Sequence, residues 1–266
     1  MKIATWNVNS VKARIGTVTK WLETAKPDIA CLQEIKTVDE AFPYLEIEAL
    51  GYNVAVHGQK SYNGVAILSK RPFEDVMPRL PGEDTDKQAR YLEAVVMGDE
   101  APVRVASIYL PNGNPVLESD GSFTEKYQYK LRWLARLKAH AQTLLTHEEA
   151  LVLAGDYNVI PRAGDTHDPK AWWGDAAFRP ETHDAFRALL GIGLTEAFDQ
   201  MDGRDEQYSF WDYQAGAWQQ NNGIRIDHLL LSPQAADRIT ALKIDRDVRD
   251  WVKPSDHVPV IGTFDV

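Results

Sequence analysis

The apolar stretch at residues 150–154 is followed at once by Gly155, Asp156, Tyr157 and Asn158. The apolar part predicts a buried β-strand. Because side chains alternate between the two faces of a strand, Asp156 and Asn158 are expected to point the same way, with Tyr157 turned to the opposite side in packing. Gly155 is expected to allow a close backbone approach. The fold must therefore let a core strand present an acid and an amide at one edge of a sheet.

Other segments along the chain have strand or helix patterns. Apolar alternation and β-branched residues predict strands at 2–8, 29–33, 52–56, 64–69, 91–96, 103–110, 151–154, 226–231 and 258–264. Apolar residues that recur three or four positions apart predict helices at 11–25, 127–144 and 182–190. The last is expected to have Thr182 as its N-cap and to stop at Gly191. Many strands with a few interspersed helices imply an α/β sandwich. No linker, repeat or low-complexity tract divides the chain, so we expect one domain over residues 1–266.

Composition restricts the cellular compartment and the partners expected for this chain. Cys31 is the single cysteine, which excludes an internal disulfide or a thiolate-rich zinc site and favours a core-packing role. With no recognisable secretory signal and no apolar run of the ~20 residues that a membrane span needs, we expect a cytoplasmic protein that avoids membranes. The net charge of −10 disfavours broad attraction to nucleic acid, unless part of it is concentrated in a metal site.

Polar residues of a restricted kind occur at six strand ends. They are Asn7 with Asn9, Gln33 with Glu34, Tyr109, Asp156 with Asn158, Asp227, and Asp256 with His257. Each alone has an ordinary explanation, such as a turn-forming Asn, a core tyrosine or a semi-buried histidine. Independent turns would not favour acids, amides, tyrosine and histidine so consistently, so we interpret them as one site. Carboxylates and amides without cysteine suit Mg²⁺ or Mn²⁺, which points to phosphoryl chemistry.

Seven motifs in order carry a resemblance to a known family. They are TWNVN at 5–9, LQE at 32–34, NGVA at 63–66, YLPNG at 109–113, GDYN at 155–158, RID at 225–227 and SDH at 255–257. In order and approximate spacing they resemble the exonuclease III type of abasic-site (AP) endonuclease, within the wider endonuclease/exonuclease/phosphatase superfamily. The resemblance runs from about residue 2 to about residue 264.

That resemblance implies a fold and an activity. The fold is a DNase I-like four-layer α/β/β/α sandwich, with two packed mixed sheets between helices. The activity is Mg²⁺-dependent (or Mn²⁺-dependent) hydrolysis of double-stranded DNA in repair, including base excision repair. Its substrates are abasic sites and 3′ ends, and we expect a monomer.

The resemblance also implies roles for the residues at the strand ends. Glu34 looks like the main metal ligand, with Asn7 and Asn9 beside it and Asp256 near the metal or a second ion. Asp156 would orient or deprotonate the attacking water, and Asn158 would hold the water and the phosphate. Asp227 would fix the tautomer of His257, while His257 and Tyr109 would contact the scissile phosphate. An Asp227–His257 hydrogen bond would also raise the basicity of the imidazole.

The resemblance identifies residues that would contact DNA less directly than it identifies the catalytic residues. Arg90, Asn112 and Lys126 resemble residues that hold backbone phosphates, although Lys126 could be a solvated helix residue. Phe210, Trp211 and Ile224 resemble an apolar pocket for a base-free deoxyribose, or else aromatic residues that cap the core. Some relatives have a large aromatic residue in place of Ile224, which leaves the pocket's shape open.

Three other functions compete with the nuclease interpretation. A phospholipid or inositol-phosphate phosphodiesterase of the same superfamily would keep the catalytic residues and change the substrate loops. A non-catalytic interaction domain should have lost one of Glu34, Asp156, Asp227 or His257, and all are present. A secreted general nuclease of the DNase I type would usually carry a signal peptide and disulfides. The sequence does not rank AP endonuclease, 3′→5′ exonuclease, 3′-phosphatase and RNase H-like activities.

Overall fold

A computed structural model describes all residues, 1–266. The strands are β1 (Lys2–Asn7), β2 (Ile29–Gln33), β3 (Asn53–His57), β4 (Val65–Ser69), β5 (Phe73–Pro78), β6 (Tyr91–Met97), β7 (Pro102–Tyr109), β8 (Ala150–Asp156), β9 (Thr195–Glu196), β10 (Asp227–Leu231), β11 (Ile239–Ile244) and β12 (Val260–Phe264). The α-helices are α1 (Ile15–Ala25), α2 (Tyr44–Glu48), α3 (Glu125–Leu145), α4 (Pro180–Leu190), α5 (Ala197–Met201) and α6 (Pro233–Ala236). Short 3₁₀ turns occur at Asp39–Ala41, Ala163–Asp165 and Arg246–Asp250.

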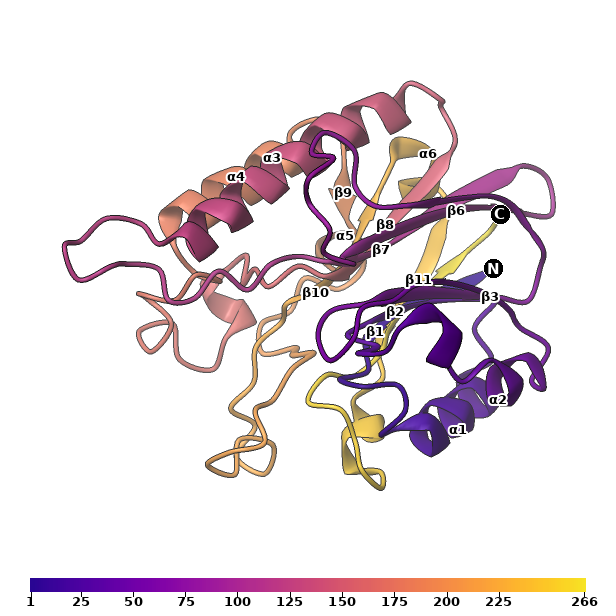
Figure 1. Cartoon of the computed structure of the whole chain (residues 1–266), viewed down its shortest axis with the longest axis horizontal. Coiled ribbons are helices and arrows are strands. Elements are labelled where there is room, and N and C mark those ends of the chain that lie inside the picture. Colours follow the sequence, from indigo (N-terminus) through magenta and orange to yellow (C-terminus); the bar gives the residue numbers. More distant parts are fainter.

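The strands form two six-stranded sheets that pack face to face. Their orders are β11-β12-β1-β2-β4-β3 and β5-β6-β7-β8-β10-β9. Helices α1 and α2 cover the outer face of the first sheet, and α3 and α4 cover that of the second (Figure 1). This four-layer arrangement confirms the fold class predicted from the sequence.

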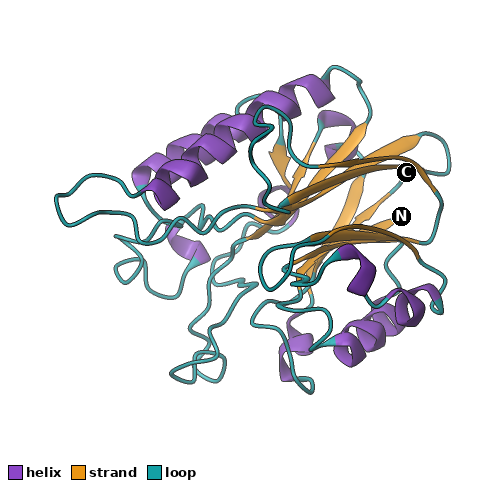
Figure 2. Ribbon diagram, viewed as in Figure 1, coloured by secondary structure: helices purple, strands orange, loops and turns teal.

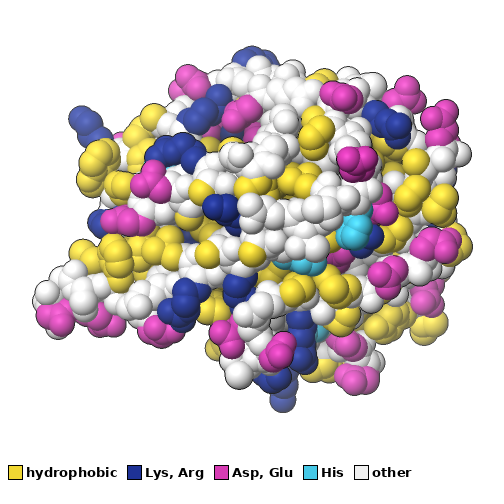
Figure 3. Space-filling view, turned by 90° about the horizontal axis from the view of Figure 1, so that it is seen from above, with side chains coloured by type: hydrophobic (Ala, Val, Ile, Leu, Met, Phe, Trp, Pro, Cys, Tyr) yellow, Lys and Arg dark blue, Asp and Glu magenta, His cyan; other side chains and the backbone are white.

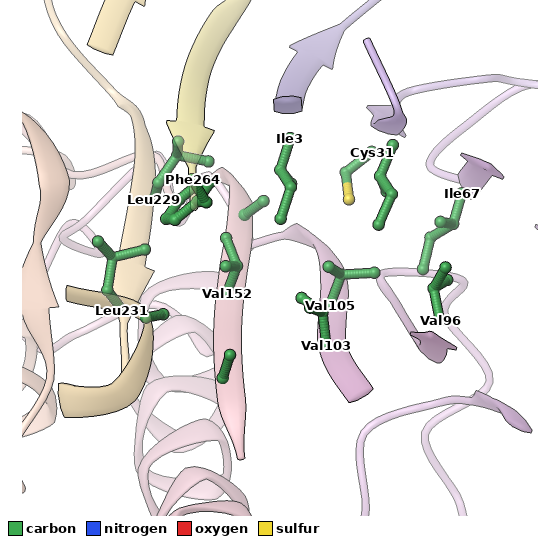
Figure 4. Packing of buried hydrophobic residues seen from close by; sticks show 14 of the residues in the cluster. Ile3, Cys31, Ile67, Val96, Val103, Val105, Val152, Leu229, Leu231 and Phe264 are labelled. Carbon is green, nitrogen blue, oxygen red and sulfur yellow. The ribbon is translucent and has the colours of Figure 1, made fainter. Parts of the chain in front are cut away.

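Three apolar layers hold the sandwich together. Between the sheets, Ile3, Cys31 and Ile67 of one sheet face Val105 and Val152 of the other (Figure 4). In one outer layer, α1 and α2 pack onto the outer face of the first sheet. In the other, α3 and α4 pack onto the outer face of the second sheet. Each fully buried aliphatic side chain contributes about 1.5–3 kcal/mol. Cys31 is a core residue as predicted, and burial raises the pKa of its thiol.

The sequence patterns missed some elements and misplaced two helix starts: α1 begins at Ile15 rather than at residue 11, and α4 begins before Thr182. The edge strands β5 and β11 were not predicted, because both are largely exposed and carry charged residues with weak strand preference. Helix α4 begins at Pro180 with Arg179 as N-cap, so Thr182 lies inside the helix. Proline suits the first helical position because its missing N–H needs no partner there. The Thr182 hydroxyl instead donates to Ala176 O, at 2.7 Å.

The topology brings six polar strand ends to one edge of the sandwich. Strands β1 and β2 are parallel across α1, and β7 and β8 are parallel across α3, so all four end at the same edge. Strands β10 and β12 run antiparallel to β8 and β1, so they begin at that edge. Loops extend from this edge of the sandwich (Figure 2, teal), while both chain termini lie at the opposite edge (Figure 1).

One face of the molecule carries both signs of charge. Seen from above, Lys and Arg side chains are interspersed with Asp and Glu side chains, without a broad patch of either sign (Figure 3). The net charge of −10 is therefore not concentrated on this face. None of the helices has the length and apolar character required to cross a bilayer.

Candidate active site

The sheet register aligns three of the predicted site residues. Tyr109 of β7 pairs with Asp156 of β8, and Asp156 pairs with Asp227 of β10. All three follow the inward-facing alternation of their strands, which places apolar residues such as Val105, Val152 and Leu229 between the sheets. The site is therefore the polar end of the inter-sheet core.

A buried histidine connects two of these carboxylates. His257 Nδ1 lies 2.9 Å from Asp227 Oδ2, and His257 Nε2 lies 3.7 Å from Asp156 Oδ2. Ser209 Oγ donates to the same Asp227 oxygen at 2.6 Å and accepts the Asp227 backbone N–H. Asp227 therefore orients the imidazole, and the other ring nitrogen, Nε2, faces Asp156.

The electrostatics of this group follow from burial and proximity. Burial alone would lower the pKa of His257, but the charges of Asp227 and Asp156 outweigh it and raise the pKa to about 10. Burial raises the pKa of Asp156, and Asp227 adds to that shift while His257 opposes it. An imidazolium beside a carboxylate of raised pKa is a pair suited to exchanging a proton with a bound substrate.

Asn7 joins the two sheets at the site. Its Nδ2 donates to Glu34 Oε1 at 2.8 Å and to Asp156 Oδ2 at 2.9 Å. Its Oδ1 accepts the backbone N–H of Asn9 at 3.0 Å. In this arrangement Asn7 orients the two carboxylates, and its oxygen is turned away from them rather than offered as a metal ligand.

The remaining predicted metal ligands form a group of oxygen donors. Glu34 Oε2 and Asn9 Oδ1 lie 2.8 and 2.6 Å from Lys36 Nζ, and Asn9 Nδ2 donates to Asp256 Oδ1 at 3.1 Å. Burial would raise the pKa of Glu34, but hydrogen bonds from Asn7 and Lys36 lower it, so this carboxylate stays ionised. The Lys36 ammonium lies against oxygens of Glu34 and Asn9, and carboxylate and amide oxygens of this kind suit a hard metal ion.

The backbone at the site departs from ordinary conformations. Asn9, Glu34 and Asn158 have φ values of +43°, +50° and +48°. Left-handed residues other than glycine are uncommon and concentrate at functional sites. Strand β8 ends at Asp156, so Asn158 lies beyond the strand. Gly155 was interpreted correctly, since a Cβ there would lie 2.1 Å from Ile108 O.

Tyr109 and Arg90 lie together at the rim. The Arg90 guanidinium stacks 4.8 Å from the centre of the Tyr109 ring, and its Nη1 donates to Tyr109 O at 3.3 Å. Burial raises the pKa of the Tyr109 hydroxyl, and the charges of Glu34 and Asp156 raise it further, so this group is a hydrogen-bond donor. Gln88 Oε1 accepts the Arg90 Nε–H at 2.7 Å and fixes the guanidinium.

Comparison with known proteins identifies the family of the chain. The sequence model of the Endonuclease/Exonuclease/phosphatase family matches residues 4–257. The chain belongs to this family. The matched span contains every residue of the site from Asn7 to His257.

Members of this family with known names resemble the chain along its whole length. Exodeoxyribonuclease III of Haemophilus influenzae is 32% identical and covers 99% of this chain and 100% of its own. An AP endonuclease from Archaeoglobus fulgidus has a structure that is 36% identical, with a TM-score of 0.92 and full coverage of both chains. The 3′ phosphatase NExo from Neisseria, bound to a product DNA hairpin, is also 36% identical with full coverage of both chains, and its TM-score is 0.93.

The residues predicted to contact DNA are partly exposed and partly buried in the structure. Asn112 is exposed beside the site, with its Nδ2 3.4 Å from Asn158 Oδ1. Phe210 packs edge-on against His257 with ring centres 4.9 Å apart, and Ile224 is 3% exposed beneath it. Trp211 is a correction: it has no exposed surface, and its indole N–H is bonded to Asn221, so it belongs to the core. Lys126 is an exposed residue in the first turn of α3, without a side-chain partner.

Family motifs did not reveal several supporting residues. Ser209 and Lys36 hold the site groups described above, and both lie within two residues of positions that the sequence did single out. Arg225 was quoted only as part of a motif. It is 1% exposed, pairs with both oxygens of Asp165, and lies 3.1 Å from Glu196 Oε1. This buried ion cluster anchors the segment that leads into Asp227.

Replacing Glu196 tests that cluster through stability. Burial would raise the pKa of Glu196, but Arg225 and His228 lower it from 4.5 to about 2. The stabilisation is therefore complete above about pH 4.5 and is lost as the pH falls toward 2. We expect Glu196→Gln to lower the free energy of unfolding by about 3–5 kcal/mol at pH 7, because it leaves Arg225 incompletely paired.

Urea unfolding at several pH values measures this difference. The gap between the unchanged protein and Glu196→Gln should shrink as the pH falls below about 4.5. Exposed Glu118→Gln is the matched control and should have no measurable effect. A gap that stays constant down to the lowest pH at which the protein folds would contradict the ionised state of Glu196.

Proposed function

We propose that this protein is a metal-dependent DNA phosphodiesterase of DNA repair that acts on double-stranded DNA at abasic sites and at 3′ ends. The observation that carries the proposal is the buried Asp227–His257–Asp156 group, joined through Asn7 to Glu34. Relatives named exodeoxyribonuclease III, AP endonuclease and 3′ phosphatase support the substrate class. We further propose that residues 1–266 work as one monomeric domain in the cytoplasm.

The residues of the site divide the work of phosphodiester hydrolysis. Asp156 orients the attacking water and accepts its proton, and Asn158 positions that water. As the water oxygen bonds to phosphorus, the opposite P–O ester bond breaks, and the leaving oxygen takes up a proton from solvent to become an alcohol. Protonated His257, held by Asp227, donates a hydrogen bond to a phosphate oxygen where negative charge grows, and the Tyr109 hydroxyl and Arg90 do the same from the rim. Phe210 excludes water from the imidazole. No covalent intermediate with the protein is needed.

Glu34, Asn9 and Asp256 are the residues that would hold Mg²⁺ or Mn²⁺. A bound ion would supply positive charge at the scissile phosphate. Glu34 is the central ligand because its carboxylate stays ionised and is held in direction by Asn7. Asp256 borders the same space through its bond to Asn9 and could extend the site toward a second ion.

Metal removal gives the first test of this function. We expect EDTA to abolish hydrolysis of a duplex with a central abasic analogue and of an undamaged blunt duplex, and added Mg²⁺ or Mn²⁺ to restore it. Gel separation of the labelled products distinguishes incision at the abasic site from shortening at the 3′ end. Cleavage that continues in EDTA would contradict the metal mechanism. Hydrolysis of a phospholipid or inositol phosphate, with both duplexes intact, would favour the competing class of phosphodiesterase.

A further inference from the structure

A fully buried lysine lies beneath the loops that carry the site. Lys130, in the second turn of α3, has no exposed surface. Its ammonium donates to Asn158 O at 2.6 Å and to Asn112 O at 3.1 Å. Both partners are backbone carbonyls rather than carboxylates, so the charge has no direct ionic partner.

Placing an ammonium here is unfavourable by itself. Burial lowers the pKa of Lys130 to about 7, although the charges of Asp175 and Asp156 partly oppose the shift. The neighbouring buried positions on α3, such as Leu134 and Leu137, are apolar, and a methionine would fill similar space. Only the two hydrogen bonds of Lys130 require a lysine, because an apolar side chain could make its other contacts.

Those hydrogen bonds join the two loops that leave β7 and β8. The Asn158 carbonyl is held by Lys130, and the Asn158 N–H donates to Asp156 Oδ1 at 2.9 Å. The Asn158 side chain in turn donates to Leu110 O at 2.9 Å. Asn158 is thus held in its left-handed conformation from both sides of its backbone, and it holds one oxygen of Asp156.

The loop after β7 closes tightly over the lysine. Gly113 has a φ of +90°, and a Cβ at this position would lie 2.7 Å from Lys130 Cδ. Only glycine allows both the conformation and the close contact. The same loop contains Asn112, whose side chain reaches Asn158 Oδ1.

We propose that Lys130 is a positioning residue for the reaction: its ammonium fastens the Asn112 and Asn158 loops together and thereby fixes the carboxylate of Asp156 relative to the attacking water. The inference rests on the proposed hydrolytic function of the site. It assigns Lys130 no contact with substrate or metal. Its effect is on the geometry of catalysis, where a misplacement of about 1 Å can cost on the order of 100-fold in rate.

Lys130→Met tests the proposal, with Lys138→Met as the matched control. Lys138 lies two turns further along α3 and has no side-chain hydrogen bond or ion pair. We expect Lys130→Met to lower kcat about 10- to 100-fold on the duplex that the unchanged enzyme cleaves best. KM should stay within about threefold, because Arg90 and Tyr109 are untouched. Lys138→Met should match the unchanged enzyme.

A second measurement needs no substrate and separates this proposal from the proposed function. Hydrogen exchange of the Asn158 amide should become at least about tenfold faster in Lys130→Met, while core amides of β8 such as Val152 stay protected. If Lys130→Met does not fold, Lys130→Gln replaces it, since its shorter side chain cannot reach both carbonyls. A folded variant with unchanged kcat, or with unchanged exchange at Asn158, overturns the positioning role. Inactivity of the unchanged enzyme on DNA would overturn the proposed function, and the exchange result would still decide the role of Lys130.

Discussion

Asp156→Asn is expected to lower kcat for DNA hydrolysis by at least about 1000-fold while the protein remains folded. The amide has the shape of the carboxylate but cannot accept a proton from water. Its NH₂ group must also face one of two donors, Asn7 Nδ2 or the Asn158 N–H, which now approach the carboxylate at 2.9 Å each. This mismatch costs about 1–3 kcal/mol of stability, too little to unfold a chain of this size.

Single-turnover kinetics with excess enzyme measures the chemical step for this variant. Circular dichroism and the melting temperature show that it is folded. Asp75→Asn, on the exposed edge strand β5, is the matched control and should retain full activity. Near-normal turnover by Asp156→Asn would remove Asp156 from the role of general base and transfer that role to another group.

His257→Ala is the second substitution with a large expected effect. It removes the proposed hydrogen-bond donor to the phosphate and leaves Asp227 bonded only to Ser209 and without its ionic partner. We expect kcat to fall about 100- to 10,000-fold, with a smaller effect on DNA affinity, because the hydrogen bond strengthens as charge grows on the phosphate. Loss of the edge-on contact with Phe210 should also reduce stability modestly.

Measuring both kcat and the DNA dissociation constant distinguishes an effect of His257→Ala on catalysis from an effect on DNA binding. Binding is measured in EDTA, so that no cleavage occurs. His147→Ala, at an exposed histidine in the turn after α3, controls for the loss of an imidazole elsewhere. A variant that binds DNA far more weakly but cleaves it at the normal maximal rate would make His257 a binding residue rather than a catalytic one.

The sequence predicted the central strands well, since strands of this kind depend on local signals. Runs of apolar residues mark β1, β2, β7, β8 and β10 because these strands are buried by the sandwich on both faces. The edge strands β5 and β11 lack that signal, since both are largely exposed to water. Thr182 looked like an N-cap from its residue type alone, but the neighbouring Pro180 determines where the helix begins.

The amino-acid sequence by itself determined the donor set, which consists of oxygen ligands, one histidine and no usable thiol, and the strands that would deliver it. Only the tertiary structure decided which atoms meet. Asn7 turns its nitrogen to two carboxylates, Trp211 enters the core, and a buried Lys130 ties two loops together. The physical reason is that periodicity and residue preference act between neighbours in the chain. The register of the strands and the packing of one sheet on the other are set by contacts between residues well separated in the chain, such as Ile3 with Ile29 within a sheet and Asn7 with Asp156 between the sheets.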